Sequence, residues 1–212
     1  MSYQIVQIKP KGRAKTRFVL ELEPELAEAL ELGAEVIAAA ALRKGDTLSA
    51  EKVSELRRED ESLRCRSKAW DLLALRPRSV RELEQALRQR RFSPATIEAT
   101  LARLDELGHL DDEAYARLFV DQRVARRDKG PRLVRQELQQ RGIAPAIIEE
   151  ALSPAEDRPH QVQSARALLE KWNRRSKPDD PVKRKAAAAS YLMRRGFEPE
   201  VVWEVIGEVA EE

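Results

Sequence analysis

The chain reads Leu138-Gln-Gln-Arg-Gly-Ile143-Ala-Pro145-Ala-Ile-Ile148-Glu-Glu-Ala-Leu152, and this segment has two further copies. They are Leu87-Arg-Gln-Arg-Arg-Phe92-Ser-Pro94-Ala-Thr-Ile97-Glu-Ala-Thr-Leu101 and Leu192-Met-Arg-Arg-Gly196-Phe197-Glu-Pro199-Glu-Val-Val202-Trp-Glu-Val-Ile206. Corresponding positions lie 51 and then 54 residues apart. A repeat of this length is typical of solenoids, in which each unit needs a neighbour to cover its apolar face.

Each copy contains the signals of a helix that ends and a helix that begins. The proline sits where a missing N–H costs nothing, at the first helical position. Phe92, Ile143 and Phe197 precede that position and are expected to pack against the first turn. We therefore predict a mainly α fold with three tandem three-helix repeats, a helical solenoid of nine helices.

A small β-hairpin/helix module is expected ahead of the repeats. Residues 5–8 and 18–22 alternate like strands, residues 25–42 favour helix, and a further helix is predicted over 50–75. The polar start of that helix suggests the module boundary. The expected domains are the module at 1–62 and three repeats at 63–108, 109–153 and 154–212.

In the second repeat the helix that opens near Asp111-Asp112-Glu113 is expected to bury Tyr115, Leu118 and Phe119. Acidic residues suit a helix N-terminus because they oppose the positive end of its dipole.

The composition excludes several classes of protein. The chain has 212 residues, of which 36% are charged, and a net charge of only +2. Its single cysteine, Cys65, rules out a disulfide framework. No apolar run is long enough to cross a bilayer, and the first residues do not resemble a secretion signal. We expect a cytoplasmic monomer that binds no membrane, metal or cofactor.

Basic residues are concentrated in the middle of the chain. Residues 122–141 carry seven cations against Asp128 and Glu137, a net charge of +5. Residues 76–91 carry six cations against Glu82 and Glu84, a net charge of +4. Arginine predominates, and its planar fork suits phosphates and carboxylates. Because single cations near helix C-termini are explained by the helix dipole, only the density of these clusters points to a binding strip.

The cations predicted to contact a partner protein or DNA lie in these clusters and in the third copy of the repeated segment. They are Arg76, Arg78, Arg88, Arg91, Arg123, Arg126, Arg127, Lys129, Arg132, Arg135, Arg141, Arg194 and Arg195.

Four motifs resemble signatures of the RecX family of recombinase regulators. They read Leu75-Arg-Pro-Arg-Ser-Val-Arg-Glu-Leu83, Leu104-Asp-Glu-Leu-Gly-His-Leu-Asp-Asp-Glu-Ala-Tyr-Ala116, Lys129-Gly-Pro-Arg-Leu-Val-Arg-Gln-Glu-Leu-Gln-Gln-Arg-Gly-Ile143 and Tyr191-Leu-Met-Arg-Arg-Gly-Phe197. Together they span residues 64 to about 210. The N-terminal hairpin resembles an extension found in part of the family, and His109 departs from the family's usual aromatic residue.

The resemblance implies a protein that is not an enzyme and that modulates the RecA recombinase, mainly as an inhibitor. Members of the family bind in the helical groove of the RecA–DNA filament. ATP hydrolysis, strand exchange and co-protease activity toward the LexA repressor then fall, which connects the family to homologous recombination, DNA repair and the SOS response. DNA is expected to be contacted weakly or within the filament.

Two other functions remain open at this point. Three-helix units rich in arginine also occur in autonomous DNA-binding modules, although no row of aromatic residues suggests base stacking here. For an enzyme, His109 with Asp111, Asp112 and Glu113 is the one cluster that could hold a metal or exchange protons. Helix capping explains the three carboxylates more simply.

Overall fold

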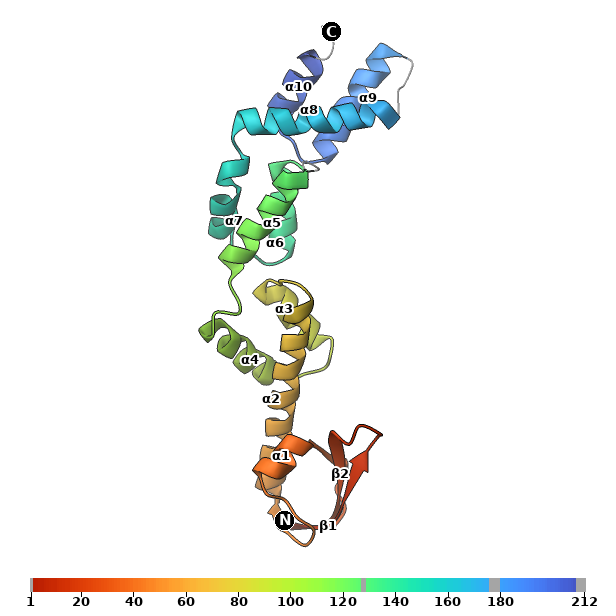
Figure 1. The fold of residues 1–212 in the computed structure, drawn as a ribbon, viewed down its shortest axis with the longest axis vertical. Coiled ribbons are helices and arrows are strands. Elements are labelled where there is room, and N and C mark those ends of the chain that lie inside the picture. The colour runs from red at the N-terminus through yellow and green to blue at the C-terminus, as the bar shows by residue number, and fades with distance from the viewer. Residues whose placement is uncertain (1, 127–128, 176–179, 209–212) are drawn as a thin grey trace. The chain divides into compact units, whose positions relative to one another are not determined.

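The computed structural model describes residues 2–126, 129–175 and 180–208, without the side chains of 124–126, 175 and 208. In that part the chain forms four strands and ten helices (Figure 1). They belong to two compact units. One unit consists of Met1–Arg76 with Glu84–Glu106, and the other of Pro77–Leu83 with Leu107–Glu212.

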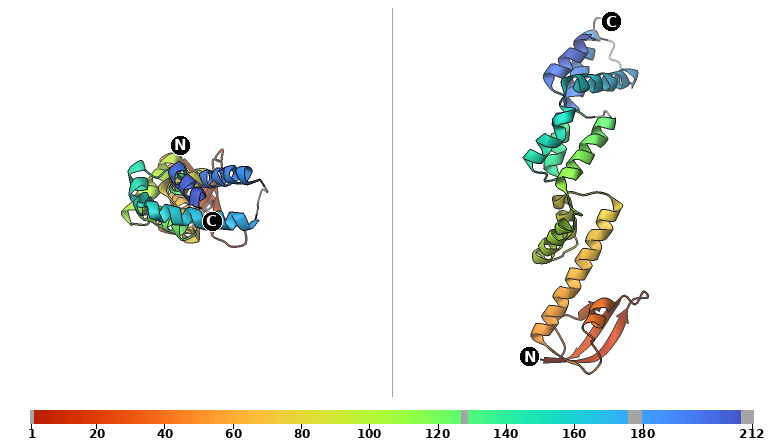
Figure 2. Two further views of the ribbon diagram at one scale, coloured as in Figure 1. Left: turned by 90° about the horizontal axis from the view of Figure 1, so that it is seen from above. Right: turned by 60° about the vertical axis from the view of Figure 1, so that its left-hand side comes forward.

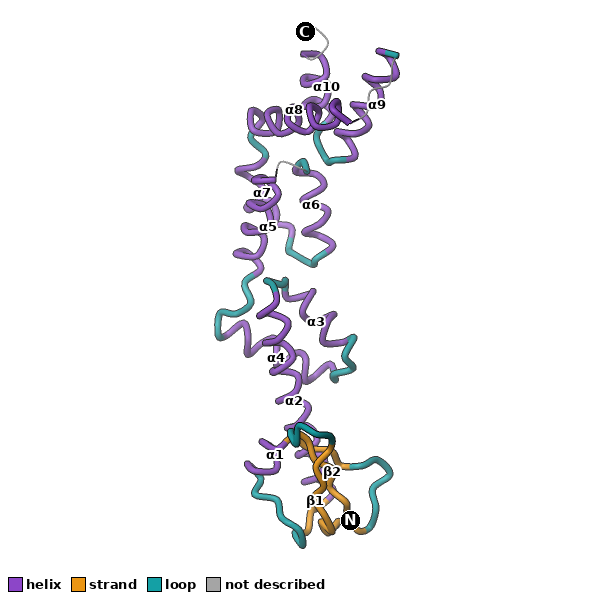
Figure 3. The backbone as a smooth tube through the Cα atoms, turned by 45° about the vertical axis from the view of Figure 1, so that its right-hand side comes forward, coloured by secondary structure: helices purple, strands orange, loops and turns teal. Residues whose placement is uncertain are grey.

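The N-terminal module is a four-stranded antiparallel sheet with one helix, α1 (Ala34–Ala39), inserted in the chain between its third and fourth strands (Figure 3). Its strands are β1 (Ser2–Lys11), β2 (Arg17–Glu23), β3 (Leu30–Gly33) and β4 (Thr47–Ser49), in the order β3-β2-β1-β4. The predicted hairpin is β1 and β2, paired with Lys11 opposite Arg17. The sheet is therefore larger than the two strands that the sequence suggested.

The prediction of helix over residues 25–42 is correct only at Ala34–Ala39, because residues 30–33 form a strand and residues 25–29 and 40–42 belong to no helix. Leu30 and Leu32 lie on either side of Glu31, and both are fully buried on the inner face of the sheet. Their strand pairs with β2, which places Leu30 opposite Leu20 and Leu32 opposite Phe18. A strand of four residues carries too little periodicity to be distinguished from the start of the adjoining helix.

Helix α2 (Ala50–Leu75) is one unbroken helix of 26 residues that serves two cores of the first unit (Figure 2). Ser49 caps it by accepting a hydrogen bond from Lys52 N–H at 3.1 Å. Near its start Val53 and Leu56 pack into the core of the sheet. Farther along, Cys65, Ala69 and Leu72 are buried where α2 contacts α4 (Pro94–Glu106). The expected domain boundary at residue 62 falls inside this helix and stays a proposal.

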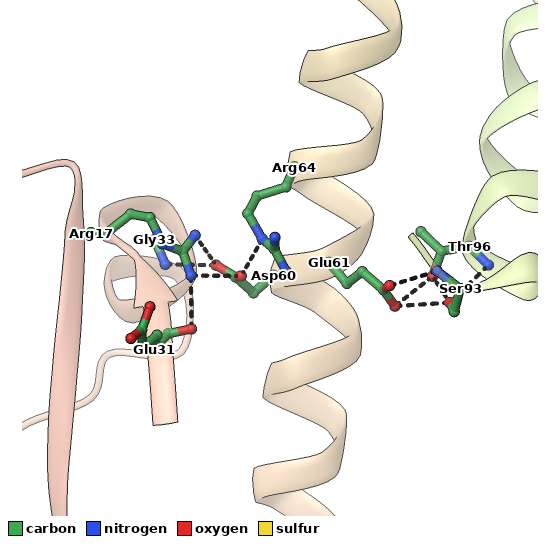
Figure 4. Close-up of polar contacts among 8 residues, drawn as sticks. All are labelled: Arg17, Glu31, Gly33, Asp60, Glu61, Arg64, Ser93 and Thr96. Atoms are coloured by element: carbon green, nitrogen blue, oxygen red, sulfur yellow. Dashed lines mark hydrogen bonds and ion pairs between the residues drawn. The ribbon is translucent and has the colours of Figure 1, made fainter. Parts of the chain in front are cut away.

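Two adjacent carboxylates of α2 hold different parts of the first unit (Figure 4). The side chain of Asp60 is only 4% exposed and accepts hydrogen bonds from Gly33 N–H at 2.7 Å and Arg64 Nε at 2.8 Å. Arg17 adds two more, of 3.2 and 3.1 Å to the two oxygens. Asp60 thus joins α2 to the sheet through three charge-assisted hydrogen bonds, from Gly33 and Arg17, while Arg64 supplies a fourth from within α2.

Glu61 reaches in the other direction, to the N-terminus of α4. It accepts hydrogen bonds from Ser93 N–H at 2.8 Å, Ser93 Oγ at 2.9 Å and Thr96 Oγ1 at 3.0 Å. Burial by itself raises the pKa of Glu61, but these hydrogen bonds and the charge of Arg64 outweigh it, so the pKa is lowered. The sheet and α4 are therefore both anchored to the same turn of α2.

The second unit contains two hydrophobic cores, each built by three helices. The first core lies among α5 (Asp112–Arg126), α6 (Pro131–Gln140) and α7 (Pro145–Leu152) and contains Val120, Leu138 and Ile148. The short 3-10 turn Ser153–Ala155 follows α7. The second core lies among α8 (Arg158–Arg175), α9 (Pro181–Arg194) and α10 (Pro199–Glu208) and contains Leu169, Leu192 and Phe197.

The three predicted helix triplets are confirmed in the described residues. They are α2 with α3 (Val80–Arg88) and α4, then α5–α7, and then α8–α10. The expected burial of Leu118 is wrong, because its side chain is 43% exposed. Ala116 and Val120 face the core instead.

Replacing Asp60 by alanine is expected to lower the free energy of unfolding by about 2–4 kcal/mol, because Gly33 N–H and Arg17 lose their buried partner. This loss is smaller than the loss expected for breaking a fully buried ion pair, because the side chains of Arg17 and Arg64 are 29% and 50% exposed to solvent. Urea unfolding followed by circular dichroism measures it. Asp71→Ala, which removes an exposed pair with Lys68, is the matched control and should change little. Equal midpoints for the two variants would contradict the role of Asp60.

Glu61→Gln is expected to make stability less dependent on pH. The folded pKa of Glu61 lies below the ordinary pKa of a glutamate, so its contribution to stability is present above that ordinary pKa and is lost as the pH falls through the folded pKa. The variant should be less stable than the wild type at pH 7, and the difference should shrink below about pH 4. Thermal unfolding of both proteins between pH 3 and pH 7 tests this. A constant difference over the whole range would show that Glu61 does not act through its charge.

Candidate interaction surface: the inter-repeat junctions

In the second unit, the start of one middle helix meets the end of the next middle helix at two places. At the first junction, Ser79–Arg81 meet Arg141 and Gly142, and Ser79 Oγ donates a hydrogen bond of 2.6 Å to the carbonyl of Arg141. At the second junction, Gly130–Arg132 meet Arg195 and Gly196. The N–H of Gly130 donates to the Arg195 carbonyl at 2.7 Å, and that of Arg132 to the Gly196 carbonyl at 3.1 Å.

The two junctions are copies of one another. Ser79 lies 51 residues before Gly130, and Arg141 lies 54 residues before Arg195, which are the two spacings of the repeated segment. At the first junction the Ser79 hydroxyl donates a hydrogen bond to the carbonyl of Arg141. At the second junction the N–H of Gly130 donates one to the corresponding carbonyl, that of Arg195. The spacings of 51 and 54 residues in the repeated segment could have indicated that the two junctions correspond. No residue at either junction was predicted from the sequence to join the repeats.

Glycine is required at the second junction because two stretches of backbone are in contact. A Cβ on Gly130 would lie 2.4 Å from the Gly196 carbonyl oxygen, and a Cβ on Gly196 would lie 2.4 Å from Leu133 N. At the first junction a Cβ on Gly142 would lie 2.2 Å from Arg81 Cδ. Gly142 and Gly196 also have φ of +79° and +88°, the left-handed region that favours glycine.

The junctions bring together cations that are far apart in the sequence. Arg78 precedes the contact residues of the first junction, and Arg141 is one of them. Lys129 and Arg132 lie at the second junction with Arg194 and Arg195, which end α9. The helix dipole accounts for Arg141, Arg194 and Arg195, which lie at helix C-termini, but not for Arg78, Lys129 and Arg132, which lie at helix starts. The other predicted cations of the first cluster lie in the first unit, where Arg76 follows the last residue of α2, Arg88 ends α3 and Arg91 lies in the turn after it.

Several of the predicted partner-binding cations have partners within the protein. Arg123 and Arg141 lie over the Phe119 ring, with guanidinium carbons 4.8 and 4.6 Å from its centroid. Glu137 forms ion pairs with Arg123, at 3.5 Å, and with Lys129. The side chains of Arg123 and Lys129 are only 21% and 18% exposed. This cluster stabilises the interior of the second unit through cation–π and ion-pair contacts.

Arg141 also links the first junction to α5. Its Nη1 donates to the Glu137 carbonyl at 2.7 Å, and its Nε lies 3.8 Å from Glu82 Oε1. The other oxygen of Glu82 accepts a hydrogen bond of 3.2 Å from Tyr115 Oη. Phe119, Glu82 and Tyr115 were therefore missed by the sequence analysis as residues that position the cations.

Arg135 is held by two carboxylates. Its Nε and Nη2 donate to the two oxygens of Glu149 at 2.9 Å each, a bidentate pair that joins α6 to α7, and Nη2 also contacts Glu156 at 2.5 Å. The hydrogen bonds from Glu149 raise the pKa of Arg135 although burial lowers it, and Glu156 adds to the rise. Arg135 is thus a cross-link between helices.

Other predicted cations remain largely exposed. Arg132 has a side-chain exposure of 58% and a single long ion pair of 3.6 Å to Glu198. Arg88 pairs with Glu84 on its own helix at 63% exposure, and Arg91 and Arg194 are exposed. Arg195 lies partly buried over the Tyr191 ring at 5.2 Å. The side chain of Arg126 and the whole of Arg127 lie outside the described residues.

The acidic residues near His109 act in helix capping and packing. Asp111 accepts a hydrogen bond from Ala114 N–H at 2.8 Å, and Asp112 accepts one from Val80 N–H at 3.0 Å. Glu113 pairs with Arg117 along the helix at 3.4 Å. Across residues 2–126, 129–175 and 180–208, no group of three His, Cys, Asp or Glu side chains is placed to hold a metal ion. None of the described helices is long and apolar enough to cross a membrane.

Comparison with known proteins identifies all three repeats. Residues 65–104, 111–152 and 160–206 match the models for the first, second and third three-helix domains of RecX. A protein of Bacillus subtilis named "Regulatory protein RecX" is 30% identical over 93% of this chain and 74% of its own length. One of the same name from Chlorobium phaeobacteroides is 37% identical over 67% of this chain and 93% of its own length.

Two solved structures are similar as well. A crystal structure titled as regulatory protein RecX has a TM-score of 0.67 and 25% identity, and covers 97% of this chain and 99% of its own. RecX from Lactobacillus salivarius has a TM-score of 0.64 at 25% identity, over 73% of this chain and 99% of its own.

Gly130→Ala is expected to destabilise the second unit by about 1–3 kcal/mol, because the added methyl group overlaps the Gly196 backbone. Gly130 has φ of −83°, which alanine adopts freely, so the loss reports the contact and not backbone strain. Gly207→Ala is the control, since a Cβ there meets nothing within 4 Å and alanine favours a helix. Thermal unfolding should show a lower midpoint for the first variant only. A Gly130→Ala protein as stable as the wild type would mean that the two backbones separate freely.

Proposed function

The chain belongs to the RecX family of regulatory proteins, and we propose that it regulates the RecA recombinase, mainly as an inhibitor. The proposed mode is binding in the groove of the RecA–DNA filament, which lowers ATP hydrolysis, strand exchange and co-protease activity toward LexA. One observation carries the proposal, namely that RecX domain models match residues 65–104, 111–152 and 160–206 in order. We further propose that the protein acts in the cytoplasm, as a monomer, without catalysis of its own.

Exposed cations supply the physical basis for contact with the filament. The charge of Arg135 is compensated by Glu149 and Glu156 within the protein, so contact with Arg135 would add little to the affinity for a partner. Arg132 and Arg194 differ, because both are exposed and both lie at the second junction. We propose that these two side chains contact acidic groups of RecA or the DNA backbone, since guanidinium groups form strong charge-assisted hydrogen bonds with either.

The test is the DNA-dependent ATPase of RecA from the same organism, assayed with increasing amounts of this protein. Turnover is expected to fall at ratios at or below one protein per RecA protomer. Unchanged turnover at every ratio, with the filament verified by electron microscopy, would refute the proposed function.

In the same assay, Arg132→Glu with Arg194→Glu is expected to raise the half-inhibitory concentration at least about tenfold, because two charge-assisted contacts are lost. The stability of this double variant should change by less than about 1 kcal/mol, since both side chains are exposed. Arg103→Glu is the control, because Arg103 is an exposed cation of α4, paired with Glu106, outside both basic clusters. Equal loss of inhibition in the control would show that net charge matters and the junction does not.

A further inference from the structure

The three middle helices α3, α6 and α9 end with the same hydrogen-bonding pattern, but with different residues. Arg91 N–H donates to the Arg88 carbonyl, Gly142 N–H to Gln139 and Gly196 N–H to Met193, each at 2.9 Å. All three residues have positive φ, of 63°, 79° and 88°. Arg91 therefore stands where the other two repeats have glycine.

Neither the backbone nor the packing favours arginine at position 91. A side chain in the left-handed region costs conformational free energy that glycine and, in part, asparagine avoid. Gly142 and Gly196 are needed because neighbouring chain leaves no space for a Cβ. The side chain of Arg91 is exposed, so glycine would fit there equally well. Backbone strain retained at an exposed position is a reason to look for a function.

The helix dipole does not account for the residue either. Arg88 lies in the last turn of α3, and Arg90 Nη1 donates a hydrogen bond of 2.6 Å to the Ala86 carbonyl, so two cations already interact with this end. Arg91 makes no side-chain hydrogen bond or ion pair with the residues that the structure describes. Its charge is therefore available to a partner.

The composition of this surface indicates the kind of partner. Residues 88–91 are all exposed, three of them are arginines, and none of the exposed large hydrophobic side chains of the described residues lies among them. Protein interfaces contain an apolar centre, whereas phosphate backbones are bound by cations without one. We infer that Arg91, together with Arg88 and Arg90, binds the phosphate backbone of nucleic acid. The inference deepens the proposed function, because it assigns a DNA contact to a protein that acts on a DNA filament.

The experiment measures binding of the full chain to a fluorescein-labelled 30-nucleotide oligothymidine by anisotropy, without RecA, between 25 and 200 mM NaCl. Arg91→Gly and Arg91→Asn are expected to weaken binding about three- to tenfold at low salt and to reduce the slope of log K against log salt by roughly 0.7. Arg91→Lys should retain both the affinity at low salt and the slope, because it keeps the positive charge. Arg103→Gln, which removes an exposed cation of α4, should have no effect on either quantity.

Stability supplies the second readout. Arg91→Gly is expected to raise the midpoint of thermal unfolding by roughly 2–4 °C while it weakens binding, because it relieves backbone strain. A stabilised variant that binds less tightly separates a functional from a structural role. If Arg91→Gly binds the oligonucleotide like the wild type, or if the wild type does not bind it at all, the inference is wrong.

The RecA ATPase assay distinguishes this inference from the proposed function. Loss of RecA inhibition in Arg91→Gly with unchanged oligonucleotide binding would overturn the assignment, because Arg91 would then contact protein. Loss of oligonucleotide binding supports the assignment even if the wild-type protein fails to inhibit RecA, an outcome that would refute only the proposed function.

Discussion

Contact between the first turn of one helix and the last turn of another organises the second unit. The N–H groups of Gly130 and Arg132 are among those that a helix start leaves without an internal partner, and the carbonyls of Arg195 and Gly196 are their counterparts at a helix end. Joining the two satisfies both sets of groups at once. It also requires the two backbones to touch, which only glycine at 130 and 196 allows. The arrangement of the cations at this junction is a consequence of that contact.

Carboxylates decide which of these cations face solvent. Glu137 lies between Arg123 and Lys129, and Glu149 binds Arg135 through both of its oxygens. A net charge counted along the sequence therefore overstates the charge that a partner would meet, because Glu149 lies outside the basic segment it neutralises. Arg132 and Arg194 remain exposed, and the ion pair of Arg132 with Glu198 is a long one of 3.6 Å. The proposed regulatory surface is smaller and more localised than the sequence suggested.

In the first unit, the neighbouring residues Asp60 and Glu61 give α2 a different role. Because successive positions on a helix point about 100° apart, one carboxylate reaches the sheet and the other reaches the start of α4. The polar stretch of α2 looks like a linker by composition, yet it contains the contacts that join the N-terminal module to the first repeat. The short strand β3 was missed for a related reason, since its burial depends on pairing with β2.

The sequence by itself determined the family, the three repeats and where their helices begin. Five helices start at a proline, namely α4, α6, α7, α9 and α10, because the conformational preference of proline and the missing N–H act locally. The tertiary structure alone decided which arginines are available to a partner. Arg141 approaches Glu82 and Arg158 pairs with Glu204 across 59 and 46 residues of chain, and no local pattern specifies contacts over such separations. The same holds at Arg91, which is exposed, whereas neighbouring chain crowds the corresponding Gly142 and Gly196.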